Sequence, residues 1–278
     1  MKFFPSSSAS FSSASSVNLF SMTRTGTTTR RIGASILTGG VLFFCVTLEA
    51  QITNDLAEAV IQGRQLAQQI LEQRPTENFT NTGTLQIRNA NGKQVEIPIK
   101  VQTTLTMAGW VNTFECIKAS NLTNDFIQIA HRNGLNIYLT SWNSGAVEAY
   151  NSGRIPDATE SFASSDFWLC DLGLEFFHWP QQKILKHEMR RGRACQVLES
   201  TNPHPAPNGY SRVVSWIDNE TLGIVQAEAY DTKGKLLKEF YPKSFKKVNG
   251  QWELQEMEIR NDQTGSRTRL EFNLKPPD

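Results

Sequence analysis

Histidine, cysteine and serine are the residue types in this 278-residue chain that could carry metal or nucleophilic chemistry. The histidines lack the spacing of a short zinc motif: they are His131, His178, His187 and His204. No cysteine stands beside a histidine that could act as its base. The chain also lacks a Gly-x-Ser-x-Gly elbow and a glycine-rich phosphate loop. We therefore expect a protein that is not an enzyme and that needs no metal or cofactor.

Basic residues are concentrated in two stretches, although the net charge of the chain is only +1. The first stretch, 183–193, reads as two strands around a turn at Arg191-Gly192 and holds Lys183, Lys186, His187, Arg190, Arg191 and Arg193. It could bind anionic headgroups or an acidic partner, but a solvated hairpin is the interpretation we favour. A second cluster holds Lys233, Lys235, Lys238, Lys243, Lys246 and Lys247. The near-neutral net charge argues against binding to nucleic acid.

Residues 1–50 differ in composition from the rest of the chain, with four basic residues and one acidic residue. An apolar run, 32–48, follows Arg30-Arg31 and precedes the small residue Ala50. This order predicts a secretory signal peptide cleaved after Ala50, with Met22 as the true start and an extension before it. A transit peptide, a twin-arginine signal and a retained membrane anchor are the alternatives.

Cleavage would leave residues 51–278 as a single domain with three cysteines, Cys116, Cys170 and Cys195. In an oxidising periplasm two of them could pair and one would be left over. Their spacing does not choose a pair, and three buried free thiols are the alternative.

One amphipathic helix is expected at the start of this domain, over residues 53–73. Apolar residues recur near helical spacing, Thr53 or Asn54 could cap the first turn, and Pro75 ends the helix. The apolar positions are Leu56, Val60, Leu66, Ile70 and Leu71.

A sheet is expected to follow the helix, starting with strands 84–88 and 93–107 around the turn Asn89–Gly92. The second strand alternates, so its apolar residues share one face, as on a curved sheet around a cavity or core; they are Val95, Ile97, Ile99, Val101, Leu105 and Met107. Pro98 predicts an edge strand or a bulge. Strands 110–117, 126–131 and 135–140 continue the sheet, with a turn at Asn133-Gly134.

The C-terminal part, 210–274, reads as a β-meander. Its strand-forming runs end at turn clusters 219–223, 231–234, 249–250 and 261–265. In the strand that starts at Gln251, the apolar residues change from one face of the strand to the other, which predicts a bulge near Gln255.

A helical segment, 156–180, is expected between the two halves of the sheet. Its apolar side chains could form one face of a short or broken helix: Phe162, Phe167, Cys170, Leu174 and Phe177, with Trp168, Leu172, Phe176 and Trp179 around them. Two interpretations stay open, ordinary core and a lid over an apolar cavity.

The order of the C-terminal motifs carries a resemblance. Trp216-Ile217-Asp218, a turn, an apolar strand, Tyr230-Asp231-x-x-Gly234-Lys235, a basic strand and a closing strand follow one another. This order resembles the outer-membrane lipoprotein-sorting proteins of the LolA-like superfamily, loosely over 56–274 and more specifically after about Asp166. The resemblance implies an α+β fold in which a strongly curved antiparallel sheet forms a half-open β-barrel with a helical lid (LolA/LolB-like).

The same resemblance implies a non-catalytic, chaperone-like periplasmic carrier that binds lipoprotein acyl chains, or another lipid, for sorting to the outer membrane. Its implied partners are an inner-membrane release complex and an outer-membrane receptor, and it would act as a monomer. A lipid- or partner-binding sensor or structural module on this fold is the alternative. The expected cavity and lid residues are Val95, Ile97, Ile99, Val101, Trp110, Phe167, Phe176, Phe177 and Trp179. The strand at 110–114 lacks the arginine that latches the lid in LolA-type carriers.

Overall fold

The computed structural model describes residues 40–117, 126–132, 134–141, 157–248 and 251–274. The chain divides into two compact units, and of the smaller one, residues 7–58, only the helical residues 40–58 are described. Residues 1–39, with the basic part of the expected leader and Met22, lie outside the described residues. Cleavage after Ala50 therefore stays a prediction. The larger unit contains all the described residues from Ala59 onward.

The first helix, α1 (Gly40–Leu71), is longer at its start than expected. Thr53 and Asn54 lie inside it rather than at its cap, because no proline interrupts residues 40–71 and a Thr or Asn inside a helix costs only about 0.5 kcal/mol. The expected end is confirmed, since the last bond runs from the Gln73 N–H to the Ile70 carbonyl, before Pro75. Within the described part of the chain, no helix is both long and apolar enough to span a membrane.

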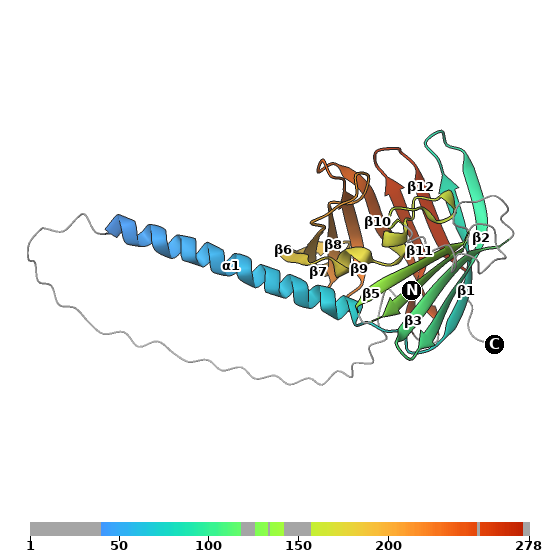
Figure 1. Cartoon of the computed structure of the whole chain (residues 1–278), viewed down its shortest axis with the longest axis horizontal. Coiled ribbons are helices and arrows are strands. Elements are labelled where there is room, and N and C mark those ends of the chain that lie inside the picture. Colours follow the sequence, from blue (N-terminus) through green and yellow to red (C-terminus); the bar gives the residue numbers. More distant parts are fainter. Residues whose placement is uncertain (1–39, 118–125, 133, 142–156, 249–250, 275–278) are drawn as a thin grey trace, which may run out of the picture. The chain divides into compact units, whose positions relative to one another are not determined.

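The larger unit is built on one antiparallel sheet whose twelve described strands follow the order β5-β4-β3-β2-β1-β12-β11-β10-β9-β8-β7-β6. The first five strands are β1 (Phe79–Arg88), β2 (Gln94–Thr106), β3 (Gly109–Cys116), β4 (Phe126–Arg132) and β5 (Leu135–Ser141). The others are β6 (Gln181–Arg190), β7 (Arg193–Thr201), β8 (Arg212–Asp218), β9 (Ile224–Tyr230), β10 (Leu236–Val248), β11 (Gln251–Asn261) and β12 (Arg267–Phe272). β1 pairs with β12 and joins the two halves. The sheet is therefore open, with β5 and β6 as its edges (Figure 1).

The C-terminal meander is confirmed as β8 to β12. The expected bulge is confirmed as well, because the pairing of β10 with β11 passes from Ser244↔Glu256 to Phe245↔Leu254 and leaves Gln255 without an opposite residue. Of the expected turn at Asn133-Gly134 only Gly134 is described, with a positive φ, and the expected turn at Asn249-Gly250 lies outside the described residues.

Pro98 marks neither an edge strand nor a bulge, because the register through it is continuous, and this corrects the expectation for this residue. β2 lies between β1 and β3 and pairs with both, with Pro98 opposite Thr84. The Pro98 carbonyl accepts from the Ile117 N–H just beyond the end of β3. The missing N–H of the proline therefore falls where the ladder with β3 ends, and an interior strand tolerates it there.

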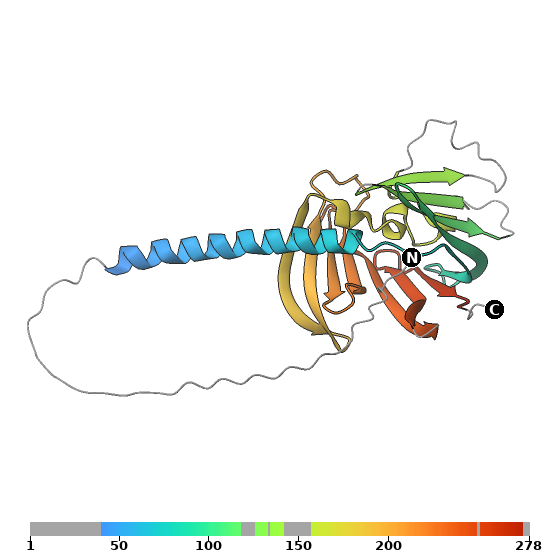
Figure 2. The same ribbon diagram turned by 90° about the horizontal axis from the view of Figure 1, so that it is seen from below.

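Residues 157–180, here called the connecting segment, link the two opposite edges of the sheet. They form three short helical pieces, η2 (Phe162–Ser164), α2 (Leu169–Leu172) and η3 (Glu175–His178). Their large apolar side chains are mostly buried in the main core, and the Phe162 ring packs edge-on against Phe114 of β3, with 6.0 Å between centroids. Figure 2 shows the sheet curving around this segment. The segment is thus part of the core, one of the two interpretations that the sequence left open.

A buried polar cluster fixes the first half of the connecting segment to the sheet. The Lys238 ammonium, on β10, donates to the Asp166 carbonyl at 2.6 Å and lies 3.3 Å from the Asp171 carboxylate. Tyr210 donates to the same carboxylate at 2.8 Å. Burial lowers the pKa of Lys238, and the charge of Asp171 acts in the opposite direction. A buried lysine is retained here because its partners replace the water it loses.

The second half of the connecting segment is fixed at both sheet edges. Asn136 and Tyr138, on β5, donate to the Glu175 carboxylate at 2.9 and 2.6 Å. On β6, the Gln182 amide donates to the Phe176 and Trp179 carbonyls, each at 2.9 Å.

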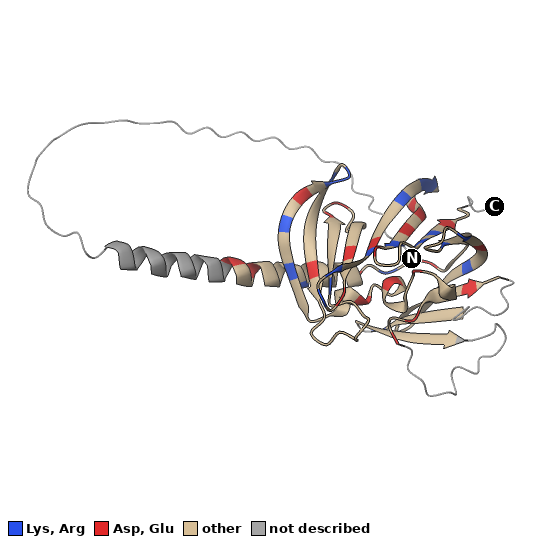
Figure 3. Cartoon of the chain, turned by 90° about the horizontal axis from the view of Figure 1, so that it is seen from above, with Lys and Arg blue, Asp and Glu red and all other residues tan. Residues whose placement is uncertain are grey.

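The basic hairpin is confirmed as β6 and β7, with Arg191 and Gly192 both at positive φ in the turn (Figure 3). Its arginines contact the sheet: Arg193 forms an ion pair with Asp218 at 2.6 Å, and Arg190 lies over the Trp216 ring. Cys116, Cys170 and Cys195 are buried free thiols.

Candidate functional site

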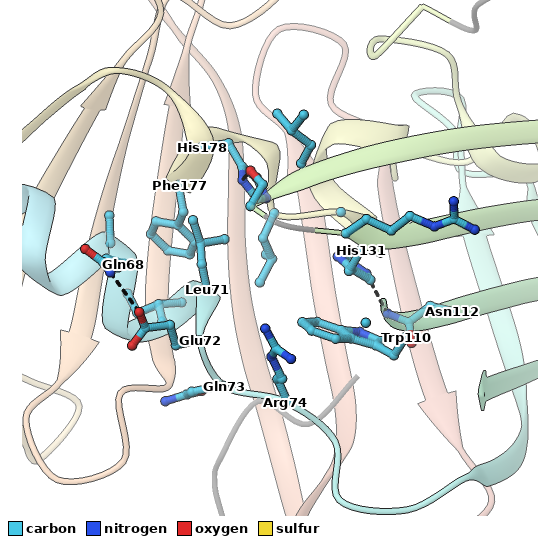
Figure 4. A pocket seen from close by; sticks show the side chains of 18 of the residues that line it. Gln68, Leu71, Glu72, Gln73, Arg74, Trp110, Asn112, His131, Phe177 and His178 are labelled. Atoms are coloured by element: carbon cyan, nitrogen blue, oxygen red, sulfur yellow. Dashed lines mark hydrogen bonds between the residues drawn. The ribbon is translucent and has the colours of Figure 1, made fainter. Parts of the chain in front are cut away.

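A pocket of about 900 Å³ opens in the larger unit, between the end of α1, the ends of β2, β3 and β4, and residues 172–180 of the connecting segment (Figure 4). Its apolar lining includes Ala67, Ile70, Leu71, Phe79, Trp110, Leu135, Leu172, Leu174, Phe177, Trp179, Leu222 and Ile224. A volume of this size is typical of a site for a small organic ligand.

One wall of the pocket is polar and ordered. The buried Thr103 hydroxyl donates to the Asn112 side-chain oxygen at 2.8 Å, and the Asn112 amide donates to His131 Nε2 at 3.0 Å. The indole of Trp110 stacks on the His131 ring, with 4.6 Å between centroids. Burial lowers the pKa of His131 to about 4, so the imidazole is neutral near pH 7. The wall therefore offers hydrogen-bonding groups without a charge.

The opposite wall comes from the last turns of α1. The Gln68 amide donates to the Glu72 carboxylate at 2.8 Å, which holds this carboxylate along the helix. Arg74 follows the helix end, and Figure 4 shows its side chain between Leu71 and Trp110. On the connecting segment, the His178 Nδ1–H donates to the Gly134 carbonyl at 2.6 Å.

The expected cavity residues fall into two groups. Trp110, Phe177 and Trp179 line the pocket. Of the others, Ile97, Ile99, Val101, Phe167 and Phe176 are buried in the main core. Val95 belongs to neither group, because it is 43% exposed near the start of β2. The connecting segment fills the middle of the concave face with packed side chains, so that the open space lies toward one end of the sheet.

Several lining residues were missed by sequence reasoning. Asn112 and His131 meet only because β3 pairs with β4, and the register of these strands is not visible in their composition. Leu222 and Ile224 were read as a turn and the start of a strand. Arg74 stands between the end of a helix and Pro75, and this position is only a weak indication that a residue lines a pocket.

The site has no constellation typical of catalysis among the described residues. The described hydrogen bonds of His131 and His178 go to an amide and a backbone carbonyl, not to a carboxylate or a thiol. In the same part of the chain, no group of three or more His, Cys, Asp or Glu residues could hold a metal ion. What the arrangement can do is enclose an apolar ligand.

Comparisons with known proteins identify the fold. A family model described as "Uncharacterized protein" matches residues 149–274. No curated protein matches the chain. Among solved structures, a putative outer membrane lipoprotein-sorting protein domain from Vibrio parahaemolyticus is similar with a TM-score of 0.63 and 19% identity, over 77% of this chain and 92% of that one.

Two further solved structures have the same architecture. A DUF1329 family protein from Desulfovibrio piger is similar with a TM-score of 0.58 and 18% identity, over 79% of this chain and 93% of that one. A LolA superfamily protein from Nitrosomonas europaea is similar with a TM-score of 0.56 and 14% identity, over 78% and 94%. The chain therefore has the fold of the LolA-like superfamily.

Proposed function

We propose that residues 51–278 form a non-catalytic carrier domain that binds acyl chains of lipoproteins or other lipids in the described pocket. The observation that carries this proposal is a largely apolar pocket of about 900 Å³, bordered by the end of α1, the ends of β2, β3 and β4 and the connecting segment, in a LolA-like fold. Each methylene that leaves water for such a pocket contributes about 0.8 kcal/mol. One acyl chain can therefore be bound without a catalytic group or a metal.

In this proposal the open, curved sheet acts as a half-open barrel and the connecting segment acts as its lid. The carrier works in the periplasm after its leader is removed, and it passes lipoproteins from an inner-membrane complex toward an outer-membrane receptor. Similarity to a lipoprotein-sorting domain supports this assignment. The lid is held by Lys238 rather than by an arginine on β3.

A matched pair of phenylalanines tests the proposal. Phe177 lines the pocket, whereas Phe167 is equally buried but lies in the core away from it. We expect Phe177→Ala to weaken the binding of a fluorescent acyl probe by roughly tenfold, because the acyl chain loses an apolar contact surface. Phe167→Ala should lower the free energy of unfolding by about 3–5 kcal/mol, with little change in affinity for the probe.

Probe titration and urea unfolding of the purified protein measure both quantities. Mass spectrometry of lipid that copurifies with the protein identifies the natural cargo. A protein that neither carries lipid nor binds the probe would rule out the carrier, and equal affinity losses in the two variants would place the ligand elsewhere.

A further inference from the structure

The charged side chains that line the pocket are mostly basic. They are Arg64, Arg74 and Arg132, against the single carboxylate of Glu72. His131 adds no charge near neutral pH, because burial lowers its pKa to about 4. The pocket therefore combines an apolar interior with an excess of positive charge.

The side chains of Arg74 and Arg132 are exposed, and neither makes a side-chain hydrogen bond or an ion pair with a described residue. Several other arginines of the described sheet are paired with carboxylates: Arg193 with Asp218, Arg212 with Glu199, and Arg260 and Arg269 with Glu258. A guanidinium that lines a pocket without a carboxylate partner keeps its donors available for a ligand.

The two arginines come from opposite sides of the pocket. Arg74 follows the end of α1 and lines the pocket, as Trp110 does (Figure 4). Arg132 is the last residue of β4 and pairs with Gly109, the neighbour of Trp110 in sequence. Arg74 and Arg132 both belong to the lining of the pocket, so the polar end of a bound amphiphile would meet positive charge there.

We propose that the pocket selects amphiphiles with an anionic head group, a carboxylate or a phosphate, which Arg74 and Arg132 bind while the acyl chain fills the apolar interior. This inference rests on the proposed function and adds the chemical class of the ligand. Guanidinium groups bind both oxyanions through paired N–H donors. A cationic head group would instead meet uncompensated positive charge.

Competition against the fluorescent acyl probe tests this with ligands of one chain length. We expect palmitate and hexadecyl phosphate to bind the full-length protein about five- to tenfold more tightly than hexadecanol, and hexadecylammonium to bind more weakly still. The ratio between palmitate and hexadecyl phosphate distinguishes the two anionic sources. Added salt should reduce the preference for the anions, because it screens exposed charges.

The double variant Arg74→Gln/Arg132→Gln should lower the affinity for palmitate to that for hexadecanol, and Arg74→Lys/Arg132→Lys should keep part of the difference. Arg88→Gln is the matched control, because Arg88 is exposed and lies outside the pocket. Equal binding of palmitate and hexadecanol by the unmodified protein would overturn the head-group assignment but leave the carrier proposal intact. A preference for palmitate over hexadecanol that survives in the double glutamine variant would do the same. Failure of every amphiphile to bind would instead reject the carrier itself.

Discussion

At the scale of single residues, the pocket wall depends on a histidine that must stay neutral. His131 Nε2 accepts a hydrogen bond from the Asn112 amide, so the lone pair that would take up a proton is already engaged in the folded protein. Burial lowers the pKa of His131 from 6.5 to about 4. The unfolded chain therefore takes up this proton more readily than the folded one, and acid favours unfolding through this residue.

The sign of the pH effect follows from this lowered pKa. The stability contributed by neutral His131 is complete above pH 6.5, the ordinary value, and is lost as the pH falls toward 4. Its size is on the order of 3 kcal/mol. We expect His131→Gln to cost about 1 kcal/mol near pH 7, through the lost ring stacking, and to be at least as stable as the unmodified protein near pH 4.

Urea unfolding at both pH values measures this difference. His204→Gln is the control, because His204 is exposed and should show the same small effect at each pH. Parallel pH profiles for the unmodified protein and His131→Gln would mean that His131 is not held neutral in the folded state.

At the scale of elements, the end of α1 depends on one close contact with the sheet. A Cβ added to Gly63 would lie 2.6 Å from the Lys183 backbone nitrogen and 2.7 Å from the Gln182 carbonyl carbon. These are backbone atoms at the start of β6, which cannot rotate away. The absence of a side chain at residue 63 therefore lets the helix lie directly on the sheet edge, with its last turns beside the pocket.

Gly63→Ala tests this contact against helix propensity. Helix propensity alone predicts that the free energy of unfolding rises by about 1 kcal/mol. The close contact predicts instead that it falls by about 1–3 kcal/mol, because the helix must shift. Acyl-probe affinity should fall as well, since Ala67, Ile70 and Leu71 line the pocket. Gln69→Ala, on an exposed position of the same helix, should change stability by less than about 0.5 kcal/mol. A more stable Gly63→Ala variant would contradict the close packing.

The elements also show how far sequence patterns reach. Strands and their turns could be predicted because alternation and turn residues are local properties. The start of α1 could not be predicted, because a residue that can cap a helix is also tolerated inside one. The position of the strand that contains Pro98 could not be predicted either, because a strand is an edge strand only if no other strand pairs with its second side. The alternation along β2 correctly predicted that Ile97, Ile99 and Val101 share one face of the strand. Whether this face borders a cavity or a packed segment depends on tertiary contacts, which the alternation does not show.

At the scale of the whole larger unit, topology determines where the connecting segment lies. β5 precedes the segment and β6 follows it, yet these strands are the two opposite edges of the sheet. The chain must cross from one edge to the other. The segment is held there by an interior anchor at Lys238 and by an edge anchor at Glu175. The pocket borders the half that carries the edge anchor, because Leu172 to Leu174 and Phe177 to Pro180 line it.

The two anchors should respond differently to mutation. Tyr138→Phe removes one donor to Glu175 and leaves the Asn136 bond, so we expect a loss of about 1 kcal/mol. Because the contact is at the edge, hydrogen exchange should speed up in residues 169–179 and the acyl probe should exchange faster, while the central strands stay protected. Lys238→Met should instead cost about 3–5 kcal/mol, because it leaves the Asp171 carboxylate without its cation, and exchange should rise throughout the sheet.

Hydrogen-exchange mass spectrometry separates these two outcomes, and Lys238→Met/Asp171→Asn provides the control. Removal of both charges should recover part of the stability lost in Lys238→Met, because no unpaired ion remains buried. Faster exchange in the central strands of Tyr138→Phe would show that the edge contact is coupled to global unfolding. In that case the segment could not open at β5 while the sheet stays folded, and ligand entry would require a different route from the edge beside Glu175.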